Sequence, residues 1–370
     1  MIRLSKPYLS ETSLQQVLDV LDSGMLVQGK WVRTFEEQLE AYLNIPHCIL
    51  VSNGTAALHL SLLAAGIGKG DEVLVPAYTF TAVANAVELT GATPVFVDIC
   101  IKDCCLDTTG IATKITARTK AIIAVHEFGM MCNMAELEII ANKHKLFIIE
   151  DAACALGASY HHQKAGTLGF TGCFSFHPRK ILTTGEGGAI VTKDVGIADR
   201  LRKMRNHGID LSGSAPDFVL PGFNYRMTDF QAALGPEQLA VLDDVIAENN
   251  NQAAFYNEVL GQIEGIQLPK PISNSEATYQ TYHLVFENNL KRDQVKLALK
   301  EEGIESNIGA YAIPYLTYYK EKYKIPEEAC SNALFAFTNG LAIPLGIHLG
   351  EGDQKRITDI IINVMKDGIS

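Results

Sequence analysis

Between about residue 45 and residue 205, short apolar runs alternate with segments whose apolar residues recur at helical spacing. The apolar runs, which predict strands, are 47–52, 72–75, 94–98, 121–125, 147–150, 172–176 and 189–192. The segments between them, such as 56–65, 81–89 and 134–144, place apolar residues at i, i+3 and i+4, which is typical of helices. Strands that are apolar along their whole length and separated by helices predict an α/β fold with a mainly parallel seven-stranded sheet between helices.

The chain is long enough for two lobes, because its 370 residues exceed the usual size of one compact core. We predict a large domain over residues 1–245, which includes an N-terminal helical element at 13–23, and a smaller C-terminal α/β domain over 246–370. A helical run from 231–242 onwards is expected to link them. A strand at 281–287 and an amphipathic helix at 291–302 are expected in the smaller domain. The loop 208–224, rich in Gly, Ser, Pro and Asp, is long enough to suggest a function.

Composition excludes several classes of protein. The formal net charge of −11 argues against a nucleic-acid partner, which usually requires a basic surplus. No apolar run reaches the roughly 18 residues of a membrane-spanning helix, and the first residues lack the apolar core of a signal peptide, so we expect a cytoplasmic protein without a membrane partner. Eight cysteines without C-x-x-C spacing are expected to be reduced and mostly buried. His161, His162 and His348 have no partners at metal-ligand spacing, so no metal site is predicted.

Two residues at the ends of apolar strands indicate a specific chemistry. Lys180 lies in the run Ser175-Phe-His-Pro-Arg-Lys-Ile-Leu-Thr-Thr-Gly-Glu-Gly-Gly188, and Asp151 ends the run Phe147-Ile-Ile-Glu-Asp151. Enzymes that use pyridoxal 5′-phosphate (PLP) need a lysine amine to bind the cofactor aldehyde and a carboxylate to keep its ring nitrogen protonated. We expect burial and nearby positive charge to lower the pKa of Lys180. Glu150 is the weaker alternative to Asp151, because neighbouring side chains of a strand point to opposite faces.

At these residues the sequence resembles the DegT/DnrJ/EryC1/StrS sugar aminotransferases, a branch of the fold-type I PLP enzymes. The resemblance extends from Leu4-Ser-Lys-Pro-Tyr8 to the region around Pro344. It implies that Lys180 forms the Schiff base and that Asp151 binds the pyridine nitrogen. The retained lysine separates the chain from the sugar 3-dehydratases of the family, in which histidine replaces it.

The resemblance also implies further cofactor contacts. Gly54 and Thr55, in Asn53-Gly-Thr-Ala-Ala57, would bind the phosphate with Ser175, although the same segment can be a plain helix cap. Phe80 would stack on the cofactor ring, although a core phenylalanine is an equal alternative from the sequence alone. Relatives carry glutamine near the cofactor's phenolic oxygen at the position of Cys154. Asn224 would reach the phosphate of a neighbouring subunit, with Arg226 as its rival, and a homodimer is expected.

Substrate contacts are predicted from two segments. The segment Ile308-Gly-Ala-Tyr-Ala-Ile-Pro-Tyr315 resembles the substrate loop of 4-aminotransferases, which marks Tyr311 and Tyr315. Arg205 and His207, in Arg205-Asn-His-Gly208, match a family motif near the active site. His126, in Val125-His-Glu-Phe-Gly129, is expected to be structural. The run Gly24-Met-Leu-Val-Gln-Gly-Lys30 is not a P-loop, because Trp31 stands where a hydroxyl must bind magnesium.

The resemblance implies amino transfer from L-glutamate to a nucleotide-linked keto sugar, with a 4-keto-6-deoxyhexose favoured. A 3-keto sugar nucleotide, a cyclitol ketone and a different PLP reaction such as an aromatising dehydration remain alternatives, since a fold does not determine a substrate. A non-catalytic PLP-binding regulatory protein is disfavoured by the retained Lys180 and Asp151.

Overall fold

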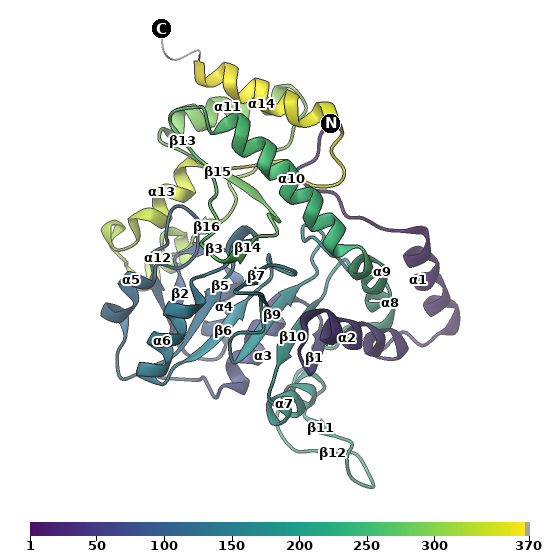
Figure 1. Ribbon diagram of the computed structural model, residues 1–370. Helices are drawn as coiled ribbons and strands as arrows, with labels where there is room; N and C mark the ends of the chain where they lie inside the picture. The colour runs from purple at the N-terminus through teal and green to yellow at the C-terminus, as the bar shows by residue number, and fades with distance from the viewer. Residues whose placement is uncertain (367–370) are drawn as a thin grey trace.

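The computed structural model describes residues 1–366, so residues 367–370, the end of the predicted C-terminal domain, lie outside the described part. Its central element is a seven-stranded sheet with the strand order β1-β10-β9-β6-β5-β2-β4 (Figure 1). All seven apolar runs that predicted strands are in this sheet. The strands are β1 His47–Val51, β2 Glu72–Pro76, β4 Thr93–Val97, β5 Thr119–Val125, β6 Phe147–Asp151, β9 Thr171–Ser175 and β10 Gly188–Thr192.

The sheet is mainly parallel, as predicted. Strands β4, β2, β5, β6 and β9 pair in parallel, whereas β10 is antiparallel to both of its neighbours, β9 and β1. The carboxyl ends of the parallel strands therefore meet at one edge of the sheet, which is where ligands of α/β sheets bind.

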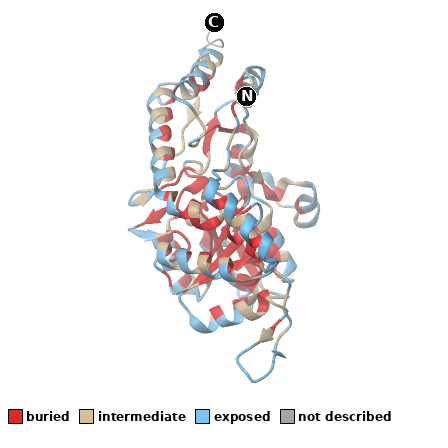
Figure 2. Ribbon diagram, turned by 90° about the vertical axis from the view of Figure 1, so that its right-hand side faces the viewer, coloured by how far each residue is buried: buried red, intermediate tan, exposed pale blue. Residues whose placement is uncertain are grey.

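Both faces of the sheet are buried, which explains why its strands are continuously apolar. Successive residues belong to different cores: Ile49 and Val51 pack in one, and Leu50 packs in the other. The first core includes α3 Gly54–Ala64, α4 Ala82–Leu89 and α7 Val195–Arg205, and the second includes α2 Lys30–Leu43 and α6 Met134–His144. Figure 2 shows the buried residues concentrated in this middle layer.

The C-terminal part of the chain forms a second lobe with a three-stranded sheet, β13-β15-β17. Its elements are β13 Ile266–Gln267, β15 Tyr282–Phe286, α11 Asn289–Glu301, η3 Ile313–Tyr315, α12 Thr317–Tyr323, η4 Glu327–Cys330, α13 Ser331–Asn339, β17 Gly340–Ile343 and α14 Glu351–Lys366. The predicted strand at 281–287 and helix at 291–302 correspond to β15 and α11. The boundary between residues 245 and 246 stays a prediction.

The linking helical run is divided into three helices, α8 Asp229–Ala232, α9 Gly235–Ala240 and α10 Leu242–Leu260, rather than being one. Pro236 lies in the first turn of α9. A proline has no backbone N–H and clashes with the preceding turn, so a helix cannot continue through it without a kink. Helix α10 then extends from the large lobe along the second lobe (Figure 1).

Short strand pairs connect the two lobes. Strand β14 Ser275–Glu276 pairs with β7 Ser159–Tyr160, which also pairs with β8 Gln163–Lys164. Strand β16 Tyr311–Ala312 pairs with β3 Tyr78–Thr79. The N-terminal segment precedes α1 Glu11–Ser23, and its Ile2 pairs with Ile304 of the second lobe.

The predicted functional loop contains a small hairpin that projects from the large lobe (Figure 1). Its strands are β11 Ile209–Asp210 and β12 Asp217–Phe218. Elsewhere in the large lobe, the segment after β4 forms α5 Thr108–Ile111 and η1 Ala112–Lys114, and β5 is followed by the turn η2 Glu127–Gly129. Within residues 1–366, no helix is long and apolar enough to span a membrane.

Candidate active site

A pocket of about 880 Å³ lies where the carboxyl ends of β5, β6 and β9 meet the start of α3. Val125, Asp151 and Ser175 are the last residues of these three strands, and all of them line the pocket. The second lobe completes the wall through residues that include Asn307, Gly309, Ala342 and Ile343. The site is therefore built between the two lobes, and every predicted cofactor residue except Asn224 lines it.

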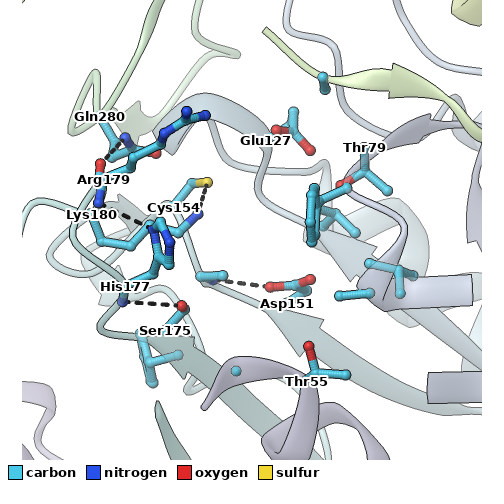
Figure 3. Close-up of a pocket in the computed structure, with 18 of the residues that line it drawn as sticks. Thr55, Thr79, Glu127, Asp151, Cys154, Ser175, His177, Arg179, Lys180 and Gln280 are labelled. Atoms are coloured by element: carbon cyan, nitrogen blue, oxygen red, sulfur yellow. Dashed lines mark hydrogen bonds between the residues drawn. The ribbon is translucent and has the colours of Figure 1, made fainter. Parts of the chain in front are cut away.

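Lys180 lies in the loop after β9 and points into this pocket (Figure 3). Its Nζ lies 2.9 Å from Sγ of Cys154, and its backbone N–H donates to the carbonyl oxygen of His177 at 2.8 Å. Burial, the largest effect, lowers the pKa of Lys180, but Cys154 and the carboxylates of Glu127 and Asp151 raise it, and the net shift is upward. The expectation of a lowered pKa was wrong, because acidic groups surround the amine.

Asp151 faces the same space from the end of β6 (Figure 3). Its Oδ1 accepts the backbone N–H of Ala153 at 3.0 Å. Burial raises the pKa of this carboxyl above its usual range, and the Ala153 N–H and the charge of Lys180 offset that effect only in part. A buried carboxylate with this sparse set of donors suits a cationic N–H, such as that of a protonated pyridine ring.

Glu150 lies on the opposite face of β6, as predicted, and has a structural role. Its two oxygens accept hydrogen bonds from Nε2 of His126 at 2.8 Å and from three backbone N–H groups at 2.6 to 2.9 Å, those of Gly166, Leu168 and Gly169. Nδ1 of His126 accepts the backbone N–H of Cys132 at 3.2 Å. The prediction that His126 is structural is confirmed, because both of its ring nitrogens are used within the core.

The start of α3 provides a site for an anion. Oδ1 of Asn53 accepts the backbone N–H of Ala56 at 2.8 Å, so Asn53 caps the helix. The N–H groups of Gly54 and Thr55 remain at the helix N-terminus, where the helix dipole also favours negative charge. A Cβ atom at Gly54 would lie 2.9 Å from Cβ of Ser175, so only glycine lets these two segments approach so closely. The cap and the anion site thus coexist, and the pocket fits the phosphate of PLP.

Phe80 and Cys154 complete the predicted cofactor residues. The Phe80 side chain lines the pocket and is 62% exposed, which is unusual for a large apolar residue beside a core. Its exposed face can cover a planar ring. Cys154 contacts Lys180 and offers only a weak donor where a glutamine amide would offer a strong one. The roles of both residues in cofactor binding stay predictions.

Five predicted residues are not part of the pocket wall in this chain. Arg205 is buried: its Nη1 donates to Glu36 at 2.6 Å and to the carbonyl oxygen of Leu50 at 2.7 Å, and its contact with substrate stays a prediction. The Tyr315 hydroxyl donates to the carbonyl oxygens of Pro326 and Glu327, at 3.1 and 3.0 Å, rather than pointing into the pocket.

His207 and Asn224 lie at the base of the projecting hairpin, where the His207 N–H donates to Phe223 and Asn224 pairs with Asn206. Their actions on substrate and on a neighbouring subunit stay predictions. Tyr311 borders the pocket only through Phe80, with ring centroids 6.3 Å apart. The rest of its segment does reach the pocket, through Gly309 and Ala310.

The structure adds pocket residues that the sequence analysis had not singled out. They are Thr79, Glu127, His177, Arg179 and Gln280, and they lie opposite or beside Lys180 in Figure 3. Nε2 of Gln280 donates to the carbonyl oxygen of Arg179 at 2.8 Å, which ties the second lobe to the loop of Lys180. Glu127 could have been found by the rule that found Asp151, since it follows an apolar strand by two residues. Within residues 1–366, no cluster of three or more His, Cys, Asp or Glu side chains could bind a metal.

A lysine amine and a buried carboxylate that face one pocket, beside a helix N-terminus on this sheet, define a PLP-dependent aminotransferase of fold type I. Residues 7–362 match the DegT/DnrJ/EryC1/StrS aminotransferase family. The chain belongs to this family.

Individual relatives agree with this assignment. The chain is 37% identical to the GDP-perosamine synthase of Caulobacter vibrioides over 98% of each sequence. It is similar in structure to the putative sugar aminotransferase Spr1654 from Streptococcus pneumoniae in its PMP form, with a TM-score of 0.93 and 28% identity, over 98% of this chain and 97% of that one. It is also similar to S. venezuelae DesV in complex with a ketimine intermediate, with a TM-score of 0.89 and 33% identity, over 96% and 94% of the two chains.

Proposed function

We propose that this aminotransferase moves the amino group of L-glutamate to a nucleotide-linked keto sugar, with C4 of a 4-keto-6-deoxyhexose as the acceptor carbon. The name of the Caulobacter relative, GDP-perosamine synthase, denotes a nucleotide-linked amino sugar as product and makes GDP the first carrier to test. The pocket volume of about 880 Å³ leaves room for a sugar beside a cofactor of PLP's size.

Each pocket residue has a separate role in the proposed reaction, which follows from its position. When bound, PLP supplies an electron sink that makes a proton on the substrate's amine-bearing carbon removable. Gly54, Thr55 and Ser175 hold the phosphate, and Asp151 accepts a hydrogen bond from the ring N–H. Lys180 would hold the cofactor covalently, and its free amine would move the proton at the substrate carbon.

The observation that carries this proposal is the meeting of Lys180, Asp151 and the start of α3 in one pocket. These residues come from three separate parts of the chain. A protein that binds PLP without catalysis would have no need to present a lysine amine and a ring-facing carboxylate together.

A visible spectrum of the purified protein with and without L-glutamate tests the first half of the reaction. We expect the band of the lysine-bound cofactor to disappear on adding glutamate and a pyridoxamine phosphate band to replace it. Lys180→Ala should lack the first band, and Glu186→Gln, which changes an exposed carboxylate at the rim of the same pocket, should behave as wild type. A wild-type band that glutamate leaves unchanged would contradict glutamate as the donor.

The acceptor is tested by product analysis. The glutamate-treated protein is offered 4-keto and 3-keto sugar nucleotides with GDP, dTDP or UDP, together with a cyclitol ketone, and the products are identified by mass spectrometry. A mass gain consistent with amination of a 4-keto sugar is expected. Exclusive use of a 3-keto sugar or of the cyclitol would contradict the proposal.

We also propose that the active protein is a homodimer in which Asn224 of the partner subunit completes the phosphate site. Asn224 is exposed at the base of the projecting hairpin and lies outside the pocket of its own chain, which supports this placement. Mixing inactive Lys180→Ala and Asn224→Ala chains should then restore activity, because one of the two sites in a mixed dimer has both residues intact. Lack of any recovery in verified mixed dimers would contradict a shared site.

A further inference from the structure

Glu127 is a buried acid of the pocket whose position is set by a strained turn. It begins the turn η2 directly after His126, and only 5% of its surface is exposed. The next residue, Phe128, has a φ of 57°, in the left-handed region that a bulky residue rarely adopts. Such a conformation costs about 1–3 kcal/mol and persists only where the surroundings hold it.

The second lobe holds this turn in place. The Phe128 ring stacks on His283 of β15, with ring centroids 4.5 Å apart and planes at 22°. The carbonyl oxygen of Gly129 accepts the N–H of Thr278 at 3.1 Å. A Cβ atom at Gly129 would lie 2.3 Å from Oγ1 of Thr278, so the turn cannot shift outward. The Glu127 carboxylate is thereby aimed into the pocket (Figure 3).

Two buried glutamates, Glu127 in the turn after β5 and Glu150 in the neighbouring strand β6, show opposite levels of hydrogen bonding. Glu150 accepts four hydrogen bonds. For Glu127, the Thr79 hydroxyl and the backbone N–H of Phe128 are the neighbouring donors that lower the pKa of its carboxyl. Among the residues that the structure describes, no cation forms an ion pair with Glu127. A buried carboxylate with so few donors is costly, so its ionisation responds to every nearby charge.

The titratable groups that interact electrostatically with Glu127 come from several elements in and behind the pocket wall. They are the Lys180 amine, the Asp151 carboxylate, the thiols of Cys154 and Cys104 and the Tyr78 hydroxyl. Burial, the largest effect, raises the pKa of Glu127; the Thr79 hydroxyl and Lys180 lower it, Asp151 raises it, and the result is about 7. Lys180 is the single cation of this group, and Glu127 in turn contributes to its raised pKa.

We propose that Glu127 is a positioning residue that controls how readily Lys180 gives up its proton. When the Glu127 carboxylate is ionised, it holds Lys180 as an ammonium ion. When Glu127 is protonated, that hold is released and the amine is freed more easily for its attack on the cofactor aldehyde. In that attack the ammonium proton is first lost to solvent, the Nζ–carbon bond then forms, and the aldehyde oxygen leaves as water.

This inference rests on the proposed role of Lys180 as the cofactor lysine. It predicts that a substitution in the pocket increases a rate instead of lowering it, because removing the Glu127 carboxylate should accelerate covalent loading of the cofactor. The acceleration should appear only where Glu127 is normally ionised. At pH 6 wild type already has Glu127 protonated, so wild type and Glu127→Gln should load at equal rates.

The test follows PLP uptake by the full-length protein after its cofactor has been removed. The growth of the visible band is timed from pH 6 to pH 8.5, and borohydride trapping with mass spectrometry identifies the lysine that carries the cofactor. We expect Glu127→Gln to load about tenfold faster than wild type at pH 8.5, the factor that one unit in the pKa of Lys180 produces, and within about twofold of wild type at pH 6.

Two further variants complete the test. Glu138→Gln makes the same chemical change at an exposed position of α6, away from the pocket, and should load as wild type at every pH. Thr79→Val removes a hydroxyl that favours the ionised form of Glu127, so the acceleration by Glu127→Gln in that background should begin at higher pH. A ratio of variant to wild-type rates that does not change with pH would overturn the inference. Cofactor trapped on a lysine other than Lys180 in wild type would instead overturn the proposed function, and the inference with it.

Discussion

Replacing Glu150 by glutamine should unfold the large lobe far more easily while leaving the pocket side of β6 chemically intact. In wild type, Oε2 of Glu150 accepts from His126 and Gly166, and Oε1 accepts from Leu168 and Gly169. A glutamine has one oxygen, so in either orientation its NH₂ group would face two N–H donors. Two charge-assisted hydrogen bonds are lost and the remaining two become neutral ones.

The magnitude follows from these bonds. A hydrogen bond to a charged group contributes about 1.5–3 kcal/mol, so the loss of two predicts a decrease of about 3–6 kcal/mol in the free energy of unfolding. Because whole domains are stable by only about 5–15 kcal/mol, this loss is a large fraction of the total.

Urea unfolding of the cofactor-free protein, followed by far-UV circular dichroism, measures this loss from the midpoint and slope. The exposed Glu186→Gln variant is the matched control and should stay within about 0.5 kcal/mol of wild type. Asp151→Asn provides the contrast, because asparagine keeps the acceptor for Ala153. Its cofactor-free stability at neutral pH should be no lower than that of wild type, because burial raises the pKa of Asp151 and the ionised carboxylate opposes folding. It should nevertheless lose most of the stabilisation by PLP, which for wild type is about 2.7 kcal/mol at 100 times the Kd. A loss below about 1 kcal/mol in Glu150→Gln would refute the reasoning.

Three further predictions follow from other contacts. Gly54→Ala should weaken PLP binding at least about tenfold in fluorescence titrations, since its Cβ would lie 2.9 Å from Cβ of Ser175 and must push the phosphate site apart. An unchanged Kd for PLP would contradict a phosphate site at the start of α3. Arg205→Met should lower the free energy of unfolding in urea by about 2–4 kcal/mol, because Glu36 loses its buried partner. The KM for the sugar substrate should stay unchanged, and a large rise in KM without a loss of stability would show that Arg205 contacts the substrate. Burial raises the pKa of Asp103 to about 7, so between pH 4 and pH 7 the folded state holds a proton that the unfolded state has lost, and this group's contribution to stability falls as pH rises. Asp103→Asn should therefore gain at least about 1 kcal/mol over wild type in urea unfolding at pH 8 and nothing at pH 4; equal differences at both would contradict the burial effect.

The layered fold could be predicted from the sequence because it depends on local patterns. Residues such as Ile49 and Leu50 face two different cores, and a strand buried on both faces must be apolar along its whole length. The same logic placed Asp151 at a strand end and Glu150 on the other face. The division of the linking run into α8, α9 and α10 was missed, although Pro236 was a visible signal for it.

The candidate site was only partly predictable. The residues that the sequence placed at strand ends, among them Asp151 and Ser175, do meet in one pocket, since carboxyl ends of parallel strands converge. The surroundings of Arg205 could not be predicted, because its place in a motif says nothing about its burial, and the structure pairs it with Glu36, a partner 169 residues away. Its substrate role and that of Tyr315 stay predictions.

The amino-acid sequence by itself determined the order of strands and helices and the chemical identities of Lys180 and Asp151, because hydrophobic period and residue type are local properties. Only the tertiary structure decided which charges share one buried space. Segments far apart in the chain together raise the pKa of Lys180 and bring the pKa of Glu127 to about 7. They also place His283 against Phe128, in the turn that positions Glu127. Electrostatic energies depend on distance and burial in space, and neither quantity can be read along the chain.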